Sequence, residues 1–291
     1  MRTQHIARPL LAALALALAA AAHAQTFTTP RPSPGAKVTQ TVGLTDLSVA
    51  YSRPGVKGRA IWGGLVPYGK PWRTGANEST QFTCSDDIQV EGQRLPAGSY
   101  AIATVPGRDQ WTVAFSTQKN ISWGVPDYDP AHDTLRVTVR PDTAQTFVER
   151  MQFTFENPTA DSVTLTLRWE TLAVPLHITV DTKAKTLASA RIAIAAAKPD
   201  DWRTPYRAAA WAFDAGVAPD ETAQWARAAA KVNENFQTSA LLARLAAKAG
   251  DTKQALALMK KSIAYGKADT TVAKDQLDAN VKQLADWSAK K

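Results

Sequence analysis

The chain has 291 residues, of which 34 are basic and 26 acidic, giving a formal net charge of +8. A single cysteine, Cys84, excludes an intramolecular disulfide. Residues 25–181 carry 14 basic and 15 acidic side chains, whereas residues 182–291 carry 18 and 11. The positive charge therefore belongs to the C-terminal part, and we expect it to meet a protein or an anionic envelope surface rather than nucleic acid.

The first 24 residues have the pattern of a secretory signal peptide. Arg2 and Arg8 lie near the N-terminus, an apolar run extends from Leu10 to Ala22, and small residues precede Gln25. The run is shorter than the roughly 20 residues that a membrane-spanning helix needs. We therefore expect export to the periplasm or the outside without a membrane span. The rest of the chain is long enough for two domains.

The next part of the chain predicts β-structure. Residues 25–36 are rich in Thr, Pro and Ser and predict a flexible leader. Residues 37–181 hold short segments that alternate apolar and polar side chains, separated by Gly- and Pro-containing turns. This pattern predicts an antiparallel β-sandwich, jelly-roll-like in type. Cys84 alternates with apolar neighbours and is expected to be buried. Because Pro175 lacks an N–H for the ladder, the last strand is expected to lie at a sheet edge or to begin at Pro175.

Residues 182–291 predict a helical domain. From Asp200 onward the apolar residues have helical spacing in five segments, the fourth ending near Gly266 and the fifth running from about Thr270 to Trp287. Gly216 and Gly250 each end a helix and lie 34 residues apart, the period of tetratricopeptide repeats. Because two helix pairs are fewer than the three repeats normally needed, we expect the fifth helix and the β domain to cover the ends of the stack.

The segment Tyr51–Glu78 is unusual in composition, with five cations, two Trp, two Tyr and six Gly. One interpretation is a plug, in which the aromatic rings fill the end of the β core and the arginines bond loop carbonyls. The other is a binding surface for a small ligand such as a glycan, with Trp rings for stacking and cations for negative groups. The candidate ligand-binding residues are Arg53, Trp62, Tyr68, Trp72, Arg73, Asn77 and Glu78.

No complete catalytic set is present in the sequence. A hydrolase would need Glu78 to work with an Asp or His partner such as Asp127 or His132. Asp127, Asp129 and Asp133 could offer oxygens to a calcium ion, but the same DYDPAHD segment is typical of an acidic turn. We assign no catalytic residue, no metal and no cofactor.

Several long motifs resemble one known family. They are YSRPGVKGR from Tyr51, LVPYGKPWRTGANE from Leu65, LPAGSYA from Leu95, the Trp111–Val113 strand and the stretch from Asp133 to Val139. Together they resemble the exported bacterial family known as domain of unknown function 2911, over most of residues 33–181. The resemblance implies a secreted or periplasmic β-rich domain, often with a helical tail, and it supplies no agreed activity, cofactor or catalytic residues.

The sequence thus favours an exported, non-enzymatic binding or scaffolding protein. The helical domain, residues 182–291, is expected to bind a protein or an anionic envelope partner, because concave faces of paired helices commonly hold peptide segments. The Tyr51–Glu78 segment is the candidate for a small ligand. The alternative is a periplasmic hydrolase, glycan-directed, that uses Glu78.

Overall fold

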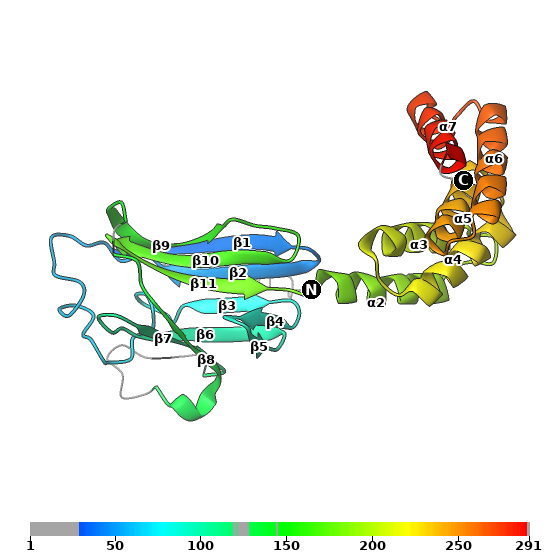
Figure 1. Ribbon diagram of the computed structural model, residues 1–291. Helices are drawn as coiled ribbons and strands as arrows, with labels where there is room; N and C mark the ends of the chain where they lie inside the picture. Colours follow the sequence, from blue (N-terminus) through cyan, green and yellow to red (C-terminus); the bar gives the residue numbers. More distant parts are fainter. Residues whose placement is uncertain (1–28, 119–120, 122–127, 144, 290–291) are drawn as a thin grey trace, which may run out of the picture.

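The computed structural model describes residues 29–118, 121, 128–143 and 145–289 of the 291-residue chain. The expected signal peptide lies outside these residues. The described chain forms two antiparallel sheets followed by six α-helices, which confirms a β-sandwich with a helical part after it (Figure 1).

All strand pairs are antiparallel, and most neighbours in each sheet are also neighbours in sequence. The larger sheet has the order β1-β2-β3-β6-β7-β8, and the smaller has the order β5-β4-β11-β10-β9. The strands are β1 (Gly35–Val42), β2 (Thr45–Ser52), β3 (Gln81–Cys84), β4 (Ile88–Val90), β5 (Gln93–Leu95), β6 (Gly98–Val105), β7 (Trp111–Ser116), β8 (Asp133–Val139), β9 (Val148–Glu156), β10 (Ser162–Glu170) and β11 (Leu172–Thr179).

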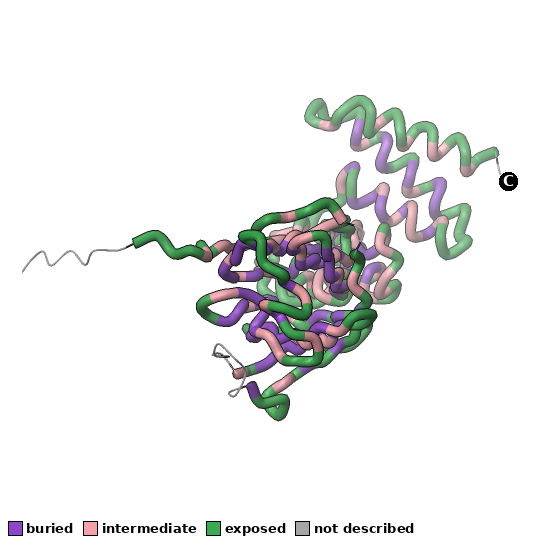
Figure 2. The backbone as a smooth tube through the Cα atoms, turned by 90° about the vertical axis from the view of Figure 1, so that its left-hand side faces the viewer, coloured by how far each residue is buried: buried purple, intermediate pink, exposed green. Residues whose placement is uncertain are grey.

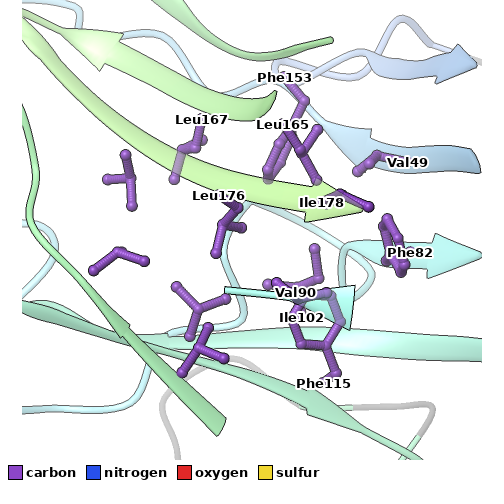
Figure 3. Close-up of a cluster of buried hydrophobic side chains, with 14 of the residues drawn as sticks. Val49, Phe82, Val90, Ile102, Phe115, Phe153, Leu165, Leu167, Leu176 and Ile178 are labelled. Carbon is purple, nitrogen blue, oxygen red and sulfur yellow. The ribbon is translucent and has the colours of Figure 1, made fainter. Parts of the chain in front are cut away.

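The core lies between the sheets, because alternate residues of each strand point inward. Val49 and Phe82 from the larger sheet and Leu165 and Ile178 from the smaller one are fully buried there (Figure 3). Cys84 belongs to this core, as the alternation predicted: it is 2% exposed and its Sγ donates to the carbonyl of Pro96. Burial raises the pKa of the Cys84 thiol to about 11.

Pro175 does not lie in an outermost strand, because β11 sits between β4 and β10. The local pairing nevertheless accommodates it. Strand β4 pairs with β11 only at Ile178 and Thr179, so Pro175 is paired with β10 and not with β4. A proline is tolerated where the ladder does not need its missing N–H.

Six helices follow the sheets: α2 (Thr182–Ala195), α3 (Arg203–Ala215), α4 (Pro219–Val232), α5 (Phe236–Lys248), α6 (Thr252–Ala268) and α7 (Lys274–Ala289). Helix α2 lies in the predicted helical domain but is not one of the five predicted segments; its apolar residues are not confined to one face, and none of them is fully buried. Gly216, with φ of +68°, ends α3 as predicted. The helix expected to end near Gly266 ends at Ala268, so Gly266 lies in the last turn of α6, where it packs against Phe236.

One end of the helical stack is covered as expected and the other is not. At one end, Leu277, Leu284 and Trp287 of α7 pack on the Met259 and Ile263 cluster, as anticipated for the last helix. Figure 2 shows this C-terminal helix largely exposed, as suits an end cap.

At the other end the covering element is α2 and not the β-sandwich. Leu187, Ala190 and Ile194 of α2 pack against the apolar cluster of α3, α4 and α5. The sandwich touches α2 through a few polar contacts: Thr182 donates to the Ala160 carbonyl at 2.7 Å, and Lys185 binds the Asp86 carboxylate. The expectation that the β domain covers this end of the stack is therefore wrong, and α2 covers it instead.

None of the helices in the described ranges has both the length and the apolar composition for crossing a bilayer.

Candidate functional site

The Tyr51–Glu78 segment connects β2 to β3 and closes one end of the sandwich. Its first part pairs with the smaller sheet, where Val56 donates to the Glu149 carbonyl at 2.8 Å. Its last part pairs with the larger sheet, where Trp72 and Thr104 exchange backbone hydrogen bonds of 2.7 and 2.8 Å. The segment is therefore hydrogen-bonded to both sheets and held across the end of the core.

Its two tryptophans enter a cluster of four indole rings. Trp111 begins β7 in the larger sheet and Trp169 lies near the end of β10 in the smaller sheet, and both are buried. Trp62 meets Trp111 edge-on at a centroid distance of 5.1 Å and Trp169 at 5.7 Å. Trp72 stacks on Trp169 at 5.9 Å, with 21° between the planes. Both loop tryptophans thus pack on core indoles, in the geometries that aromatic pairs prefer.

The indole N–H groups of this cluster differ in their hydrogen bonding. Trp72 donates to the Gly75 carbonyl at 3.2 Å. The Nε1 atoms of Trp62, Trp111 and Trp169 are buried without a hydrogen-bond partner among the described residues. The ring planes of Trp62 stand at 70° and 84° to those of Trp111 and Trp169, an arrangement in which a ring edge meets a π face.

The arginines and the asparagine of the segment bond the backbone around them. Arg53 donates from Nε to the Met151 carbonyl at 3.0 Å. Arg73 is buried and donates from Nε to the Asn77 carbonyl at 3.0 Å, and burial lowers the pKa of its guanidinium. Asn77 has φ of +56° and donates from Nδ2 to the Ser33 carbonyl and to Ser52 Oγ. These contacts are the ones that a structural plug requires.

Glu78 is exposed and paired with Arg31 at 2.6 Å. A hydrogen bond from its own backbone N–H and the Arg31 guanidinium lower the pKa of the Glu78 carboxyl, so it is ionised at neutral pH and unsuited to donate a proton. The Nε2 atom of His132 lies 3.9 Å from the Oδ2 atom of Asp129, and Asp127 is outside the described residues. No observation on the described residues favours a hydrolase built on Glu78.

The acidic segment around His132 forms a turn. Asp129 caps the 3₁₀ helix η1 (Pro130–His132) by accepting from the Ala131 N–H at 2.9 Å. Asp133 accepts from the Tyr128 hydroxyl at 2.5 Å. Within the ranges that the structure describes, no three His, Cys, Asp or Glu side chains are grouped so that they could hold a metal ion. Asp129 and Asp133 thus form hydrogen bonds within the turn itself.

Tyr68 differs from the other candidates because it lies outside the four-indole cluster. Its ring is half-buried and the Arg108 guanidinium lies 4.9 Å from its centroid. Arg108 also borders an open concavity of about 780 Å³ between the β6–β7 turn and the segment after β8. The residues around this concavity are Gly107, Arg108, Asp109, Gln110, Arg140, Pro141 and Thr143. Among the seven predicted residues, Tyr68 is connected to this concavity through Arg108.

The helical part contains a groove whose residues the sequence analysis did not name. Helices α3, α5 and α7 line this groove, which we call the concave groove, and its volume is about 250 Å³. The lining residues are Tyr206, Ala210, Phe236, Gln237, Ala240, Leu241, Arg244, Gln276, Ala279 and Asn280. The 34-residue spacing of Gly216 and Gly250 indicated paired helices, but it could not show which faces of α3 and α5 would meet α7.

The fold and these sites define an antiparallel β-sandwich, closed at one end by an indole-rich connection and extended by six helices. The family described as protein of unknown function DUF2911 matches residues 33–178, and the chain belongs to this family. The matched residues end before α2, so the concave groove lies outside the family match. Comparisons with curated proteins and with solved structures gave no match.

Proposed function

We propose that this protein is an exported binding or scaffolding protein that holds an extended peptide segment of a partner protein in the concave groove. The observation that carries the proposal is the groove itself. It is built by α3, α5 and α7, which are every second helix along the chain. Alternate helices of paired-helix repeats lie side by side and form a continuous concave surface for peptides.

The lining of the groove suits a peptide backbone. Ala210, Ala240 and Ala279 place one small side chain from each helix in the lining, so a backbone can approach closely. Gln237 and Gln276 add amide groups, which can donate to and accept from a peptide bond at once. The groove therefore favours an extended chain read through its backbone.

The helical part is best understood as a short tetratricopeptide-like stack. Helices α3 and α4 form one pair and α5 and α6 the next, and their closing glycines lie 34 residues apart. Helices α2 and α7 act as end caps, which repeat arrays need for solubility. This stack also carries the positive charge of the chain, which favours an acidic protein, or an anionic envelope surface, as its partner.

Export is supported by the signal-peptide pattern of residues 1–24. The matching experiment expresses the full chain in a bacterial host and measures the mass of the protein in periplasmic and external fractions. A mature protein that begins at Gln25 supports export, and an uncleaved protein in the cytoplasmic fraction contradicts it.

The binding proposal is tested by displaying random 12-residue peptides and selecting those that bind the mature protein. Ala240→Glu should abolish binding of the selected peptides that use the concave groove, because it places a charged side chain in the lining of the groove. Ala264→Glu is the matched control, since Ala264 is exposed on α6 and does not line the groove. A selection in which every peptide binds Ala240→Glu as well as the wild type would contradict the concave groove as a site.

A second candidate function is binding of a small anionic ligand, such as an acidic glycan, at the sandwich end beside Tyr68. It is favoured by the exposed arginines Arg108 and Arg140, which border the concavity of about 780 Å³. A glycan array probed with the mature protein tests it. Loss of a glycan signal in Arg140→Glu, with no loss in the exposed control Arg207→Glu, supports this site, and equal signals contradict it.

A further inference from the structure

A second groove lies on another face of the helical stack, between α4, α5 and α6. Its volume is about 600 Å³, within the range of roughly 300–1,000 Å³ that is usual for ligand pockets. On α5 it is lined by Leu242, Leu245 and Ala246, whereas the concave groove uses Ala240 and Arg244 of the same helix. These spacings place the two grooves on different faces of α5. We call the second one the lateral groove.

The floor of the lateral groove is apolar and incompletely covered. Leu242 and Leu245 of α5 and Leu258 of α6 line it and are only half-buried, and Ala223 of α4 joins them. No residue of the two end caps lines it, although Leu242 and Leu245 pack on the cluster that α2 also joins and Leu258 packs on the cluster that α7 joins. The exposed parts of these leucines, on the neighbouring helices α5 and α6, mark a surface that is stabilised when it is covered.

The rim of the lateral groove is basic. Arg227 and Lys248 border it; Arg227 makes no ion pair or hydrogen bond within the described part of the chain, and the Lys248 Nζ lies 5.1 Å from the centroid of the Phe213 ring. The one acidic rim residue, Asp251, is engaged as the cap of α6 and accepts from the Gln254 N–H at 2.9 Å. The rim therefore offers positive charge to an occupant.

We propose that the lateral groove docks an amphipathic segment of a partner protein, whose apolar side chains enter between the leucines and whose acidic side chains face Arg227 and Lys248. Apolar anchors with flanking charges of the opposite sign are the usual chemistry of a helix laid in a groove. With two grooves on separate faces, the helical stack can hold two chains at once and acts as a bridge between them.

The peptide selection described above distinguishes the two grooves when the selected peptides are sorted with groove variants of the full mature protein. A class of peptides rich in Leu or Phe and in Asp or Glu should bind the lateral groove. Leu242→Glu should weaken the binding of this class by roughly ten-fold or more, because it removes a leucine contact and adds a negative charge that repels the acidic peptides. Arg227→Glu should weaken it by about two- to five-fold, the usual effect of one exposed charge pair.

The same class should bind Ala240→Glu as tightly as the wild type, which separates this inference from the proposed function. Leu258→Gln serves as a milder second variant, and far-UV circular dichroism checks that each variant keeps its helices. The inference is overturned if the selection yields no acidic apolar class, or if Leu242→Glu and Leu258→Gln leave its binding unchanged. It is also overturned if the mature protein sediments as a dimer that Leu242→Glu dissociates, because the occupant is then a second copy of the chain.

Discussion

Truncation of Trp62 to alanine tests whether the Tyr51–Glu78 segment is part of the core. Trp62 contacts three other indoles edge-on, at 5.1, 5.7 and 6.0 Å. Each such pair contributes about 0.5–1.5 kcal/mol beyond the area that it buries. Burial of the ring adds to this, and buried Trp→Ala changes cost about 3–5 kcal/mol. Because Trp62 is only partly buried, we expect the lower end, about 3 kcal/mol.

The assay is thermal unfolding followed by near-UV circular dichroism, which reports the packed indoles. A loss of 3 kcal/mol corresponds to a fall in Tm of about 6–12 °C for a domain of this size. Trp62→Phe, which keeps a ring in the cluster, should fall about half as far. Tyr68→Ala, outside the cluster, should change Tm by less than about 3 °C, since its ring is half-exposed. A Trp62→Ala protein that melts within 2 °C of the wild type would refute the packing argument.

Three further predictions concern single side chains. Gly266→Ala should destabilise the helical part by about 1–3 kcal/mol in urea unfolding, because a Cβ at Gly266 would lie 2.7 Å from the Phe236 ring; an increase in stability, as for an ordinary helical glycine, would contradict this packing. Cys84 should react with a thiol reagent at pH 8 far more slowly in the native protein than in urea, since burial raises its pKa to about 11, and equal rates would show that the thiol is accessible. Burial opposes ionisation of Glu156, but hydrogen bonds from its neighbours and the Arg168 guanidinium outweigh burial and lower its pKa. Its contribution to stability is therefore present above pH of about 4.3 and is lost as the pH falls through the lower folded pKa, so Glu156→Gln should flatten the acid limb of the stability curve. An unchanged acid limb would show that Glu156 is not coupled to folding.

The sandwich could be predicted from sequence because its signal is local and periodic. In β8, Leu135, Val137 and Val139 are buried while the residues between them are exposed, which is the period-two pattern of a strand against a core. The inward thiol of Cys84 followed from the same pattern. Strand order could not be obtained in this way, because pairing between distant strands such as β3 and β6 leaves no periodic mark in either segment.

The helical part has features that local sequence patterns do not predict. The five predicted segments leave out α2, because its apolar residues are not confined to one face and its contacts with the stack are partial. The predicted helix end near Gly266 agrees with the end of α6 at Ala268, but the pattern could not show that Gly266 gives room for Phe236 to approach α6. Both features depend on contacts from another helix, which local composition does not describe.

The candidate residues of the Tyr51–Glu78 segment illustrate a different limit. Composition showed that tryptophans and arginines gather there, and both a plug and a binding surface were consistent with it. The structure gives Trp62 and Trp72 indole neighbours and gives Arg53 backbone carbonyls, which sequence spacing cannot reveal since Trp111, Met151 and Trp169 lie far along the chain. The concave groove was missed for the same reason, because its lining is shared by three helices.

Hydrogen–deuterium exchange of the mature protein with and without a selected peptide tests the central proposal most directly. If the helical part is the binding domain, the peptide should slow exchange in Phe236–Lys248 and Lys274–Ala289, two of the three helices that line the concave groove. Exchange in residues 51–78 should stay unchanged. Protection of residues 51–78 without protection of these two helices would contradict the account and place the binding site at the end of the sandwich.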